Sequence, residues 1–169
     1  GGALRGAVVR YGMTGLALTN ASPTVHECSF CDSQYDGLSC GSGAAPVVTR
    51  SAFVGNGRHG VYVTSTGRPN LGDVTNPVLT DQGENQLYGN GGLEVYNETA
   101  GEVRAQNNTW ASTDEAAIAA RVYDHADDPS RGSVIYMPLQ EITPGGGPRL
   151  DWTHETGFTA DGTDPNTAT

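Results

Sequence analysis

The sequence contains no lysine, so its nine side-chain positive charges at pH 7 all come from arginine. These are set against 19 aspartate and glutamate residues, and the 169-residue chain carries a formal net charge of −10. This balance argues against nucleic acid as a partner, because its phosphates would be repelled, and it is equally poor for an anionic membrane surface. An anionic polysaccharide would need a local basic patch or a bridging Ca²⁺ ion. The composition suits an extracellular protein.

Long apolar runs are also lacking. None is long enough to span a bilayer, so no membrane insertion is predicted. No stretch of the given sequence reads as a signal peptide, but this carries little weight because the sequence opens inside a repeat. The first residues, 1–9, already read as part of a repeat. We therefore expect further residues upstream in the parent protein.

Cysteine is scarce, with three residues at Cys28, Cys31 and Cys40. The first two have the spacing of half a zinc site, but no second pair follows, which argues against zinc. Cys40 falls on an apolar column of the repeat described below and is expected to be a small buried hydrophobe. A disulfide among the three stays open, and the sequence does not choose the pair.

What the sequence does have is a repeated four-residue phrase, in which glycine is followed by apolar residues at the first and third positions. It starts at Gly15, Gly37, Gly60 and Gly92, with spacings of 22, 23 and 32 residues. Two other markers share the period: prolines before apolar residues at Pro23, Pro46 and Pro77, and aromatic residues at Phe30 and Phe53. Repeats in the low twenties indicate a solenoid. The longer spacing predicts an inserted loop at about 64–76.

Alternation within the phrase predicts short strands that bury one face. A leucine-rich repeat would need its own Leu and Asn framework, which is absent. The interpretation left is an all-β chain forming a right-handed parallel β-helix of about 4–5 rungs of 22–23 residues. In its Pro-x-Val, Phe, Asn and Gly-Val-x-Val phrases the chain resembles the pectate-lyase-like superfamily from about Ala3 to Leu139. That superfamily includes lyases, hydrolases, epimerases, adhesins and stalks, so the resemblance implies a fold without a single activity.

The pattern changes after the repeats. Ser112 and Glu115 form a capping-box motif that predicts a short helix at about 114–123, followed by a closing strand at 134–136. We therefore expect residues 1–142 to be the C-terminal part of a β-helix with its cap. Residues 143–149 read as a Pro/Gly linker. Residues 150–169 resemble the start of an immunoglobulin-like module or form a disordered tail, as in multidomain surface proteins.

Three residues are candidates for catalysis. Asp36 and His59 are expected on adjacent rungs with their side chains outward, and Arg58 lies beside His59. This grouping is the one that a polysaccharide lyase or glycoside hydrolase would need. Asp36 to Glu94 is estimated at about 14 Å, which is too far for the paired carboxylates of a glycosidase. The other motifs of polygalacturonases and pectate lyases are missing. A turn role for His59 is therefore favoured.

Binding residues are predicted on the outward columns. Tyr35, Tyr62 and Tyr96 are candidates to stack on sugars, with Glu94 placed in the same outward column as Tyr62. For metal, Asp124, Asp127 and Asp128 are candidate calcium ligands, but their order lacks the alternating calcium loop, and a solvated turn is favoured. No other cofactor is expected.

Two functions follow from these patterns. The first is a secreted structural, adhesive or glycan-binding β-helix module of a cell-surface protein. The second is part of a polysaccharide lyase or glycoside hydrolase whose catalytic rungs are largely outside this chain. An exposed end rung would also allow end-to-end or edge self-association. The outward face discriminates between the two functions, because an enzyme needs a clustered acid, base and cation there.

Overall fold

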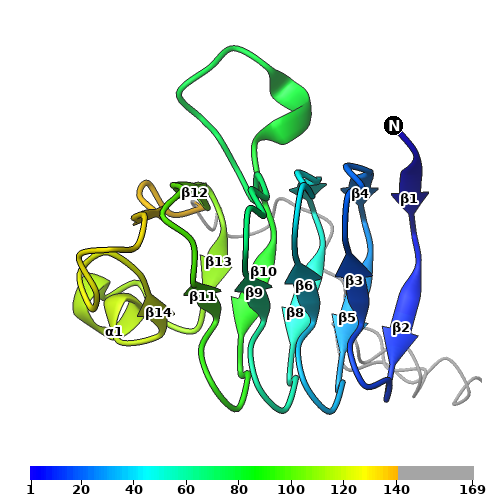
Figure 1. Ribbon diagram of the computed structural model, residues 1–169, viewed down its shortest axis with the longest axis horizontal. Helices are drawn as coiled ribbons and strands as arrows, with labels where there is room; N and C mark the ends of the chain where they lie inside the picture. The colour runs from blue at the N-terminus through cyan, green and yellow to red at the C-terminus, as the bar shows by residue number, and fades with distance from the viewer. Residues whose placement is uncertain (141–169) are drawn as a thin grey trace, which may run out of the picture.

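The computed structural model describes residues 1–140, which form a parallel β-helix of about five turns. Its named strands pair in parallel. The turns stack side by side from the N-terminus to the helix α1 at the opposite end (Figure 1). The all-β, parallel β-helix prediction is confirmed. Over this range no helix combines the length and apolarity needed to cross a bilayer. The predicted linker at 143–149 and the module predicted at 150–169 lie outside the described residues.

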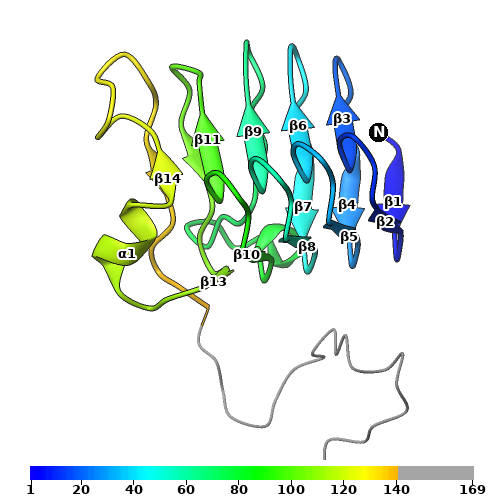
Figure 2. The same ribbon diagram turned by 90° about the horizontal axis from the view of Figure 1, so that it is seen from below.

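Three sheets run along the helix. Sheet A contains β1 (Ala3–Arg5), β4 (Thr24–His26) and β7 (Val47–Thr49), and continues through bridges at Asn70 to β12 (Val103–Arg104) and β15 (Val134–Ile135). Sheet B contains β2 (Val8–Arg10), β5 (Ser29–Cys31), β8 (Ala52–Val54), β10 (Gln86–Tyr88) and β13 (Thr109–Trp110). Sheet C contains β3 (Leu16–Leu18), β6 (Leu38–Cys40), β9 (Val61–Val63), β11 (Val95–Asn97) and β14 (Val122–Tyr123). Figure 2 shows the strands of sheet C in one row.

Alternation along each strand builds the core, because successive side chains point to opposite faces. In sheet B the inward column runs through Phe30, Phe53 and Leu87, all fully buried. The rings of Phe30 and Phe53 stack with centroids 5.5 Å apart. The aromatic repeat read from the sequence is therefore a core ladder, and its burial is the main stabilising contribution of this sheet.

The glycine that starts each phrase is required by close approach of neighbouring turns. A Cβ at Gly37 would lie 2.8 Å from the carbonyl oxygen of Gly60, and one at Gly60 would lie 2.7 Å from the carbonyl oxygen of Glu94. These distances are closer than a side chain tolerates without a shift of backbone. The same contacts place Glu94 at the glycine position of the next turn.

Buried asparagines fix the alignment of successive turns. Asn56 Oδ1 accepts a hydrogen bond from Ser33 N at 3.0 Å, and Asn90 Oδ1 accepts one from Asn56 N at 2.9 Å. A second ladder repeats the arrangement, with Ser51 N donating to Asn85 Oδ1 and Asn85 N donating to Asn108 Oδ1. Each amide bonds backbone groups that are not paired within a β-sheet. These ladders therefore stabilise the bends between one sheet and the next. Asn56 and Asn90 thus occupy equivalent structural positions on successive turns.

The register expected across the insertion is wrong by two residues. Val95 pairs with Val61 and Tyr96 with Tyr62, an offset of 34 residues rather than 32. Pro69 rather than Pro77 continues the proline marker, since Asn70 bridges to Val47. The inserted loop accordingly follows Gly72 and carries the short 3-10 helix η1 (Leu79–Asp81); it projects from the stacked turns in Figure 1.

The cap also differs from its prediction. The helix α1 spans only Glu115–Ala119, and its N-cap is Asp114, whose carboxylate accepts a hydrogen bond from Ala116 N. The expected continuation to residue 123 is wrong because Val122–Tyr123 form β14, paired with β11. Strand pairing with the preceding turn thus overrides the local helical pattern. Ile118 is buried over the core, and the predicted closing strand is present as β15.

All three cysteines are free and buried. Cys40 lies between Leu18 and Val63 on the inward column of sheet C, as predicted. Burial raises the pKa of the Cys40 thiol to about 11, so this group stays protonated at neutral pH.

Replacing Asn85 tests the asparagine ladder. Asn85→Ala leaves Ser51 N without its acceptor and removes the Asn85 donor from the carbonyls of Val48 and Leu71 in the interior, of which Leu71 keeps its bond from Asn108 Nδ2. We expect a loss of about 3 kcal/mol in the free energy of unfolding, measured by urea denaturation. Gln34→Ala removes an exposed amide and serves as the control. Equal stability of the two variants would contradict the ladder's role.

The thiols give a second test. We expect the native protein to resist alkylation by iodoacetamide at neutral pH, and the denatured protein to react at all three positions. Addition of a reductant should leave the thermal midpoint unchanged. A midpoint that drops on reduction would show a disulfide in place of free thiols.

Candidate functional site

The outer face of sheet C carries a column of three tyrosines on consecutive turns, at Tyr62, Tyr96 and Tyr123. Tyr96 and Tyr123 stack with centroids 4.5 Å apart and planes 11° apart. Tyr62 meets Tyr96 edge to face at 5.6 Å. All three are half-buried, and the same column holds only Ala17 and Ser39 on the first two turns. We call these three residues the tyrosine column.

A cation and a fourth tyrosine lie at the upstream end of the tyrosine column. The Arg58 guanidinium carbon is 4.9 Å from the ring centroid of Tyr62 and 5.8 Å from that of Tyr35. Tyr35 belongs to the preceding turn, where its carbonyl accepts a hydrogen bond from Arg58 N, and it is 41% exposed. Arg58 therefore covers Tyr62, while Tyr35 keeps an open surface.

Glu98 lies beside the tyrosine column at the end of β11. Its Oε2 accepts hydrogen bonds from Tyr62 Oη at 2.5 Å and from Thr64 Oγ1 at 3.0 Å. The bond from Tyr62 lowers the pKa of the Glu98 carboxyl, and the same bond raises the pKa of the Tyr62 hydroxyl. Glu98 is thus an ionised acceptor at neutral pH.

His59 is held as a neutral imidazole against the tyrosine column. Its Nδ1 accepts a hydrogen bond from Leu93 N at 3.1 Å. A backbone N–H can only donate, so Nδ1 carries no proton and the ring hydrogen sits on Nε2. Burial lowers the pKa of His59 below its ordinary value of 6.5. The ring packs against Tyr96 with centroids 4.9 Å apart.

The three catalytic candidates do come together, but their functional groups are already engaged. Asp36 lies on the turn next to His59, as predicted, and is 1% exposed. Its carboxylate accepts both a bidentate pair of bonds from Arg58 and a bond from His59 N at 3.2 Å. The carboxylate bonds to the backbone N of His59 and not to its imidazole, whose Nδ1 is bound to Leu93 N. A buried, fully hydrogen-bonded carboxylate and a neutral imidazole bound to backbone form a structural cluster rather than an acid–base pair.

Glu94 does not lie in the outward column with Tyr62. The expected offset of 32 residues across the insertion placed it there. In the observed register Glu94 lies at the position equivalent to Gly60, and it is 2% exposed. Its Oε1 accepts bonds from Arg121 Nε at 3.1 Å and Nη2 at 2.9 Å, and the other oxygen contacts Asn90 Nδ2. Glu94 therefore ties the cap to the last full turn, and Tyr96 takes its predicted place.

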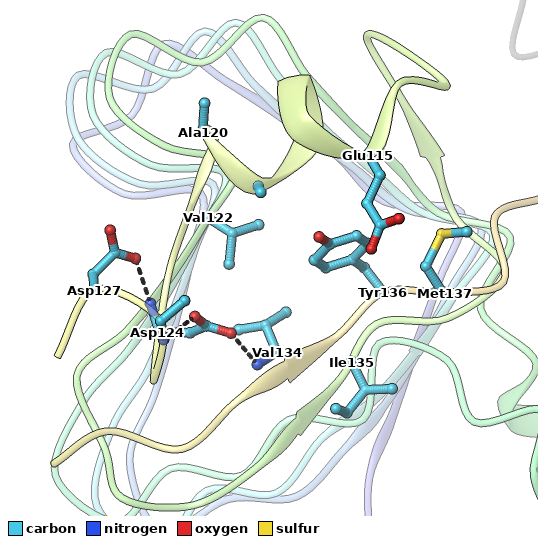
Figure 3. A pocket seen from close by; sticks show the side chains of 11 residues that line it. Glu115, Ala120, Val122, Asp124, Asp127, Val134, Ile135, Tyr136 and Met137 are labelled. Carbon is cyan, nitrogen blue, oxygen red and sulfur yellow. Dashed lines mark hydrogen bonds between the residues drawn. The ribbon is translucent and has the colours of Figure 1, made fainter. Parts of the chain in front are cut away.

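The candidate calcium ligands organise the loop after β14. Asp124 accepts hydrogen bonds from Ala126 N and Val134 N, and Asp127 accepts one from Asp124 N; Figure 3 draws the last two of these. Asp128 binds Ser130 and Arg131 instead. Among residues 1–140, no group of three or more His, Cys, Asp or Glu residues is arranged to hold a metal ion. Calcium binding stays a prediction.

The pocket in Figure 3 lies beside this loop, between α1, β14 and β15. Its volume is about 540 Å³, and it is lined mainly by apolar side chains, with Glu115 and Tyr136 at one side. It holds none of the predicted catalytic or glycan-binding residues. The pocket is formed where the hydrophobic core ends at the C-terminal cap, and we assign it no function.

Sequence reasoning missed Tyr123 and Glu98. The signal for the register was nevertheless present, because Asn56 and Asn90 mark equivalent turns and are 34 residues apart. Applied to Tyr62, that offset reaches Tyr96, and applied to Thr64 it reaches Glu98. Tyr123 carried no such signal, since its segment reads as the end of a helix.

Comparison of the chain with family descriptions, curated proteins and solved structures found no match. The functional assignment therefore depends on the geometry of sheet C.

The neutral state of His59 predicts a pH-dependent stability. The pKa of His59 in the folded protein lies below its ordinary value of 6.5, so the unfolded chain binds the proton more tightly. The free energy of unfolding therefore falls as the pH drops below 6.5. We expect wild type to lose more stability than His59→Asn between about pH 8 and about pH 5.5, measured by urea unfolding. Equal losses would contradict this assignment. NMR of the imidazole should show the Nε2–H form.

Proposed function

We propose that this chain is a glycan-binding module of an extracellular surface protein, and that the ligand lies along the tyrosine column of sheet C. The observation that carries the proposal is the alignment of Tyr62, Tyr96 and Tyr123 on consecutive turns, flanked by Arg58 and His59. Adjacent strands lie about 4.8 Å apart, so the three tyrosines form a straight row along which an extended polymer can bind.

The expected mode of contact follows from how the rings are packed. Tyr96 and Tyr123 stack on one another, so they present ring edges and hydroxyl groups rather than open faces. The Nε2–H group of His59 adds a neutral donor next to them. Tyr35 supplies the exposed aromatic surface on which a sugar ring can stack. We infer that hydroxyl recognition along the column, with one stacking platform at Tyr35, holds the ligand.

Binding without cleavage is the favoured outcome. The Asp36 carboxylate is buried against Arg58 and His59 N, which leaves it no access to a substrate. The lyase or hydrolase alternative would need a group within hydrogen-bond reach of the reacting atoms, and Asp36 does not meet that condition. An extracellular location and a multidomain parent protein complete the proposal, supported by the acidic composition and the β-helix fold.

Retention of the protein in gels containing neutral or acidic polysaccharides tests this proposal, with chain cleavage measured on the same samples. We expect retention without cleavage, and a loss of affinity of about tenfold or more for Tyr96→Ala. Tyr96→Phe keeps the ring packing and loses only the hydroxyl, so its loss should be smaller. Both variants should first be shown to be folded.

Tyr88→Ala is the matched control, because Tyr88 is a half-buried tyrosine on the outer face of sheet B. It should leave retention unchanged. Equal losses for Tyr88→Ala and Tyr96→Ala, or no retention by any polysaccharide, would reject the sheet C site. Cleavage that His59→Ala abolishes would make the chain an enzyme.

A further inference from the structure

Three arginines lie along the proposed site, and each is bound to a carboxylate. Arg58 pairs with Asp36, whose side chain is 2% exposed, and Arg121 pairs with Glu94, whose side chain is 3% exposed. Arg131 pairs with Asp128 through Nε and Oδ2 at 3.1 Å. The arginines therefore bring no net positive charge to the tyrosine column.

Glu98 is a fourth carboxylate at this site, and its side chain forms no salt bridge with these three arginines. Its Oε2 is used by Tyr62 and Thr64, and Arg131 contacts its backbone carbonyl rather than its carboxylate. With three arginines and four carboxylates, counting Glu98, the charged groups along the column sum to −1. The imidazole of His59 is neutral and adds no positive charge.

We infer that the ligand of this site is an uncharged polyhydroxylated glycan, and that Glu98 discriminates against anionic ones. This inference depends on the proposed glycan-binding function and specifies its ligand class. A carboxylate or sulfate group placed over the column would meet Glu98 and arginines that are already neutralised. A sugar hydroxyl, in contrast, can donate to Glu98 and accept from His59 Nε2–H. The specificity thus arises as much from repulsion of the wrong ligand as from attraction of the right one.

The test compares Glu98→Gln with wild type on a neutral and an acidic polysaccharide at about 20 mM and about 500 mM salt. Wild type should bind the neutral polymer at least about tenfold more tightly than the acidic one at low salt. Glu98→Gln keeps an acceptor for Tyr62 but removes the charge. It should raise binding of the acidic polymer about threefold at low salt, whereas binding of the neutral polymer should fall, because an amide oxygen accepts a hydrogen bond from a sugar hydroxyl more weakly than a carboxylate does.

Glu102→Gln is the matched control, because it changes the net charge equally at a residue beside sheet A that is 47% exposed and paired with Arg104. It should leave acidic binding unchanged, which separates a local effect from the overall charge of −10. Each arm is repeated with Ca²⁺ and with a chelator.

Tighter binding of the acidic polymer by wild type would overturn this inference while leaving a glycan-binding site in place, and so would acidic binding that requires Ca²⁺. An equal gain for Glu98→Gln and Glu102→Gln would also overturn it. Absence of binding to either polymer would instead reject the proposed function itself.

Discussion

The alignment of one turn on the next is the constraint on which the rest of this structure depends. Strand pairing alone repeats every two residues along a strand, whereas the buried amides of Asn56 and Asn90 accept and donate at one position only. An unsatisfied backbone group in the interior costs on the order of 1–3 kcal/mol, so a shift of the turns would be expensive. The ladders therefore maintain the register across the inserted loop, which lies within the fourth turn between Asn70 and β10.

The surface of sheet C follows from that register. A shift of two residues would bring Glu94 beside Tyr62 and move Tyr96 out of the column. In the observed register Glu94 turns inward to Arg121, and Tyr96 joins Tyr62 and Tyr123. The same alignment buries Asp36 against Arg58. The candidate acid–base residues Asp36 and His59 are thereby held in a structural cluster, beside an aromatic surface whose three arginines are each paired with a carboxylate.

The fold was predictable because its signals are local and repeated: the glycine phrase, the inward apolar positions and Phe30–Phe53 each recur at one period. The candidate site was only half predictable. Tyr35, Tyr62 and Tyr96 were predicted as outward-facing candidates. Gly92, however, matches the glycine of the repeat although the equivalent position in the structure is two residues later. Glu94 was consequently misplaced, and Glu98 and Tyr123 were missed. Long-range pairing of Tyr123 with Tyr96 opposes the helical pattern of its own segment, and no local signal encodes it.

The most direct measurement is disulfide trapping of the register between the third and fourth turns. Tyr62→Cys is combined with either Tyr96→Cys or Glu94→Cys, and cross-linking under mild oxidation is scored by mass spectrometry. Directly paired parallel residues lie within the Cα separation that a disulfide accepts. The observed register predicts a rapid 62–96 cross-link and little 62–94 product. A preference for 62–94 would contradict the register, and with it the tyrosine column and the site built on it.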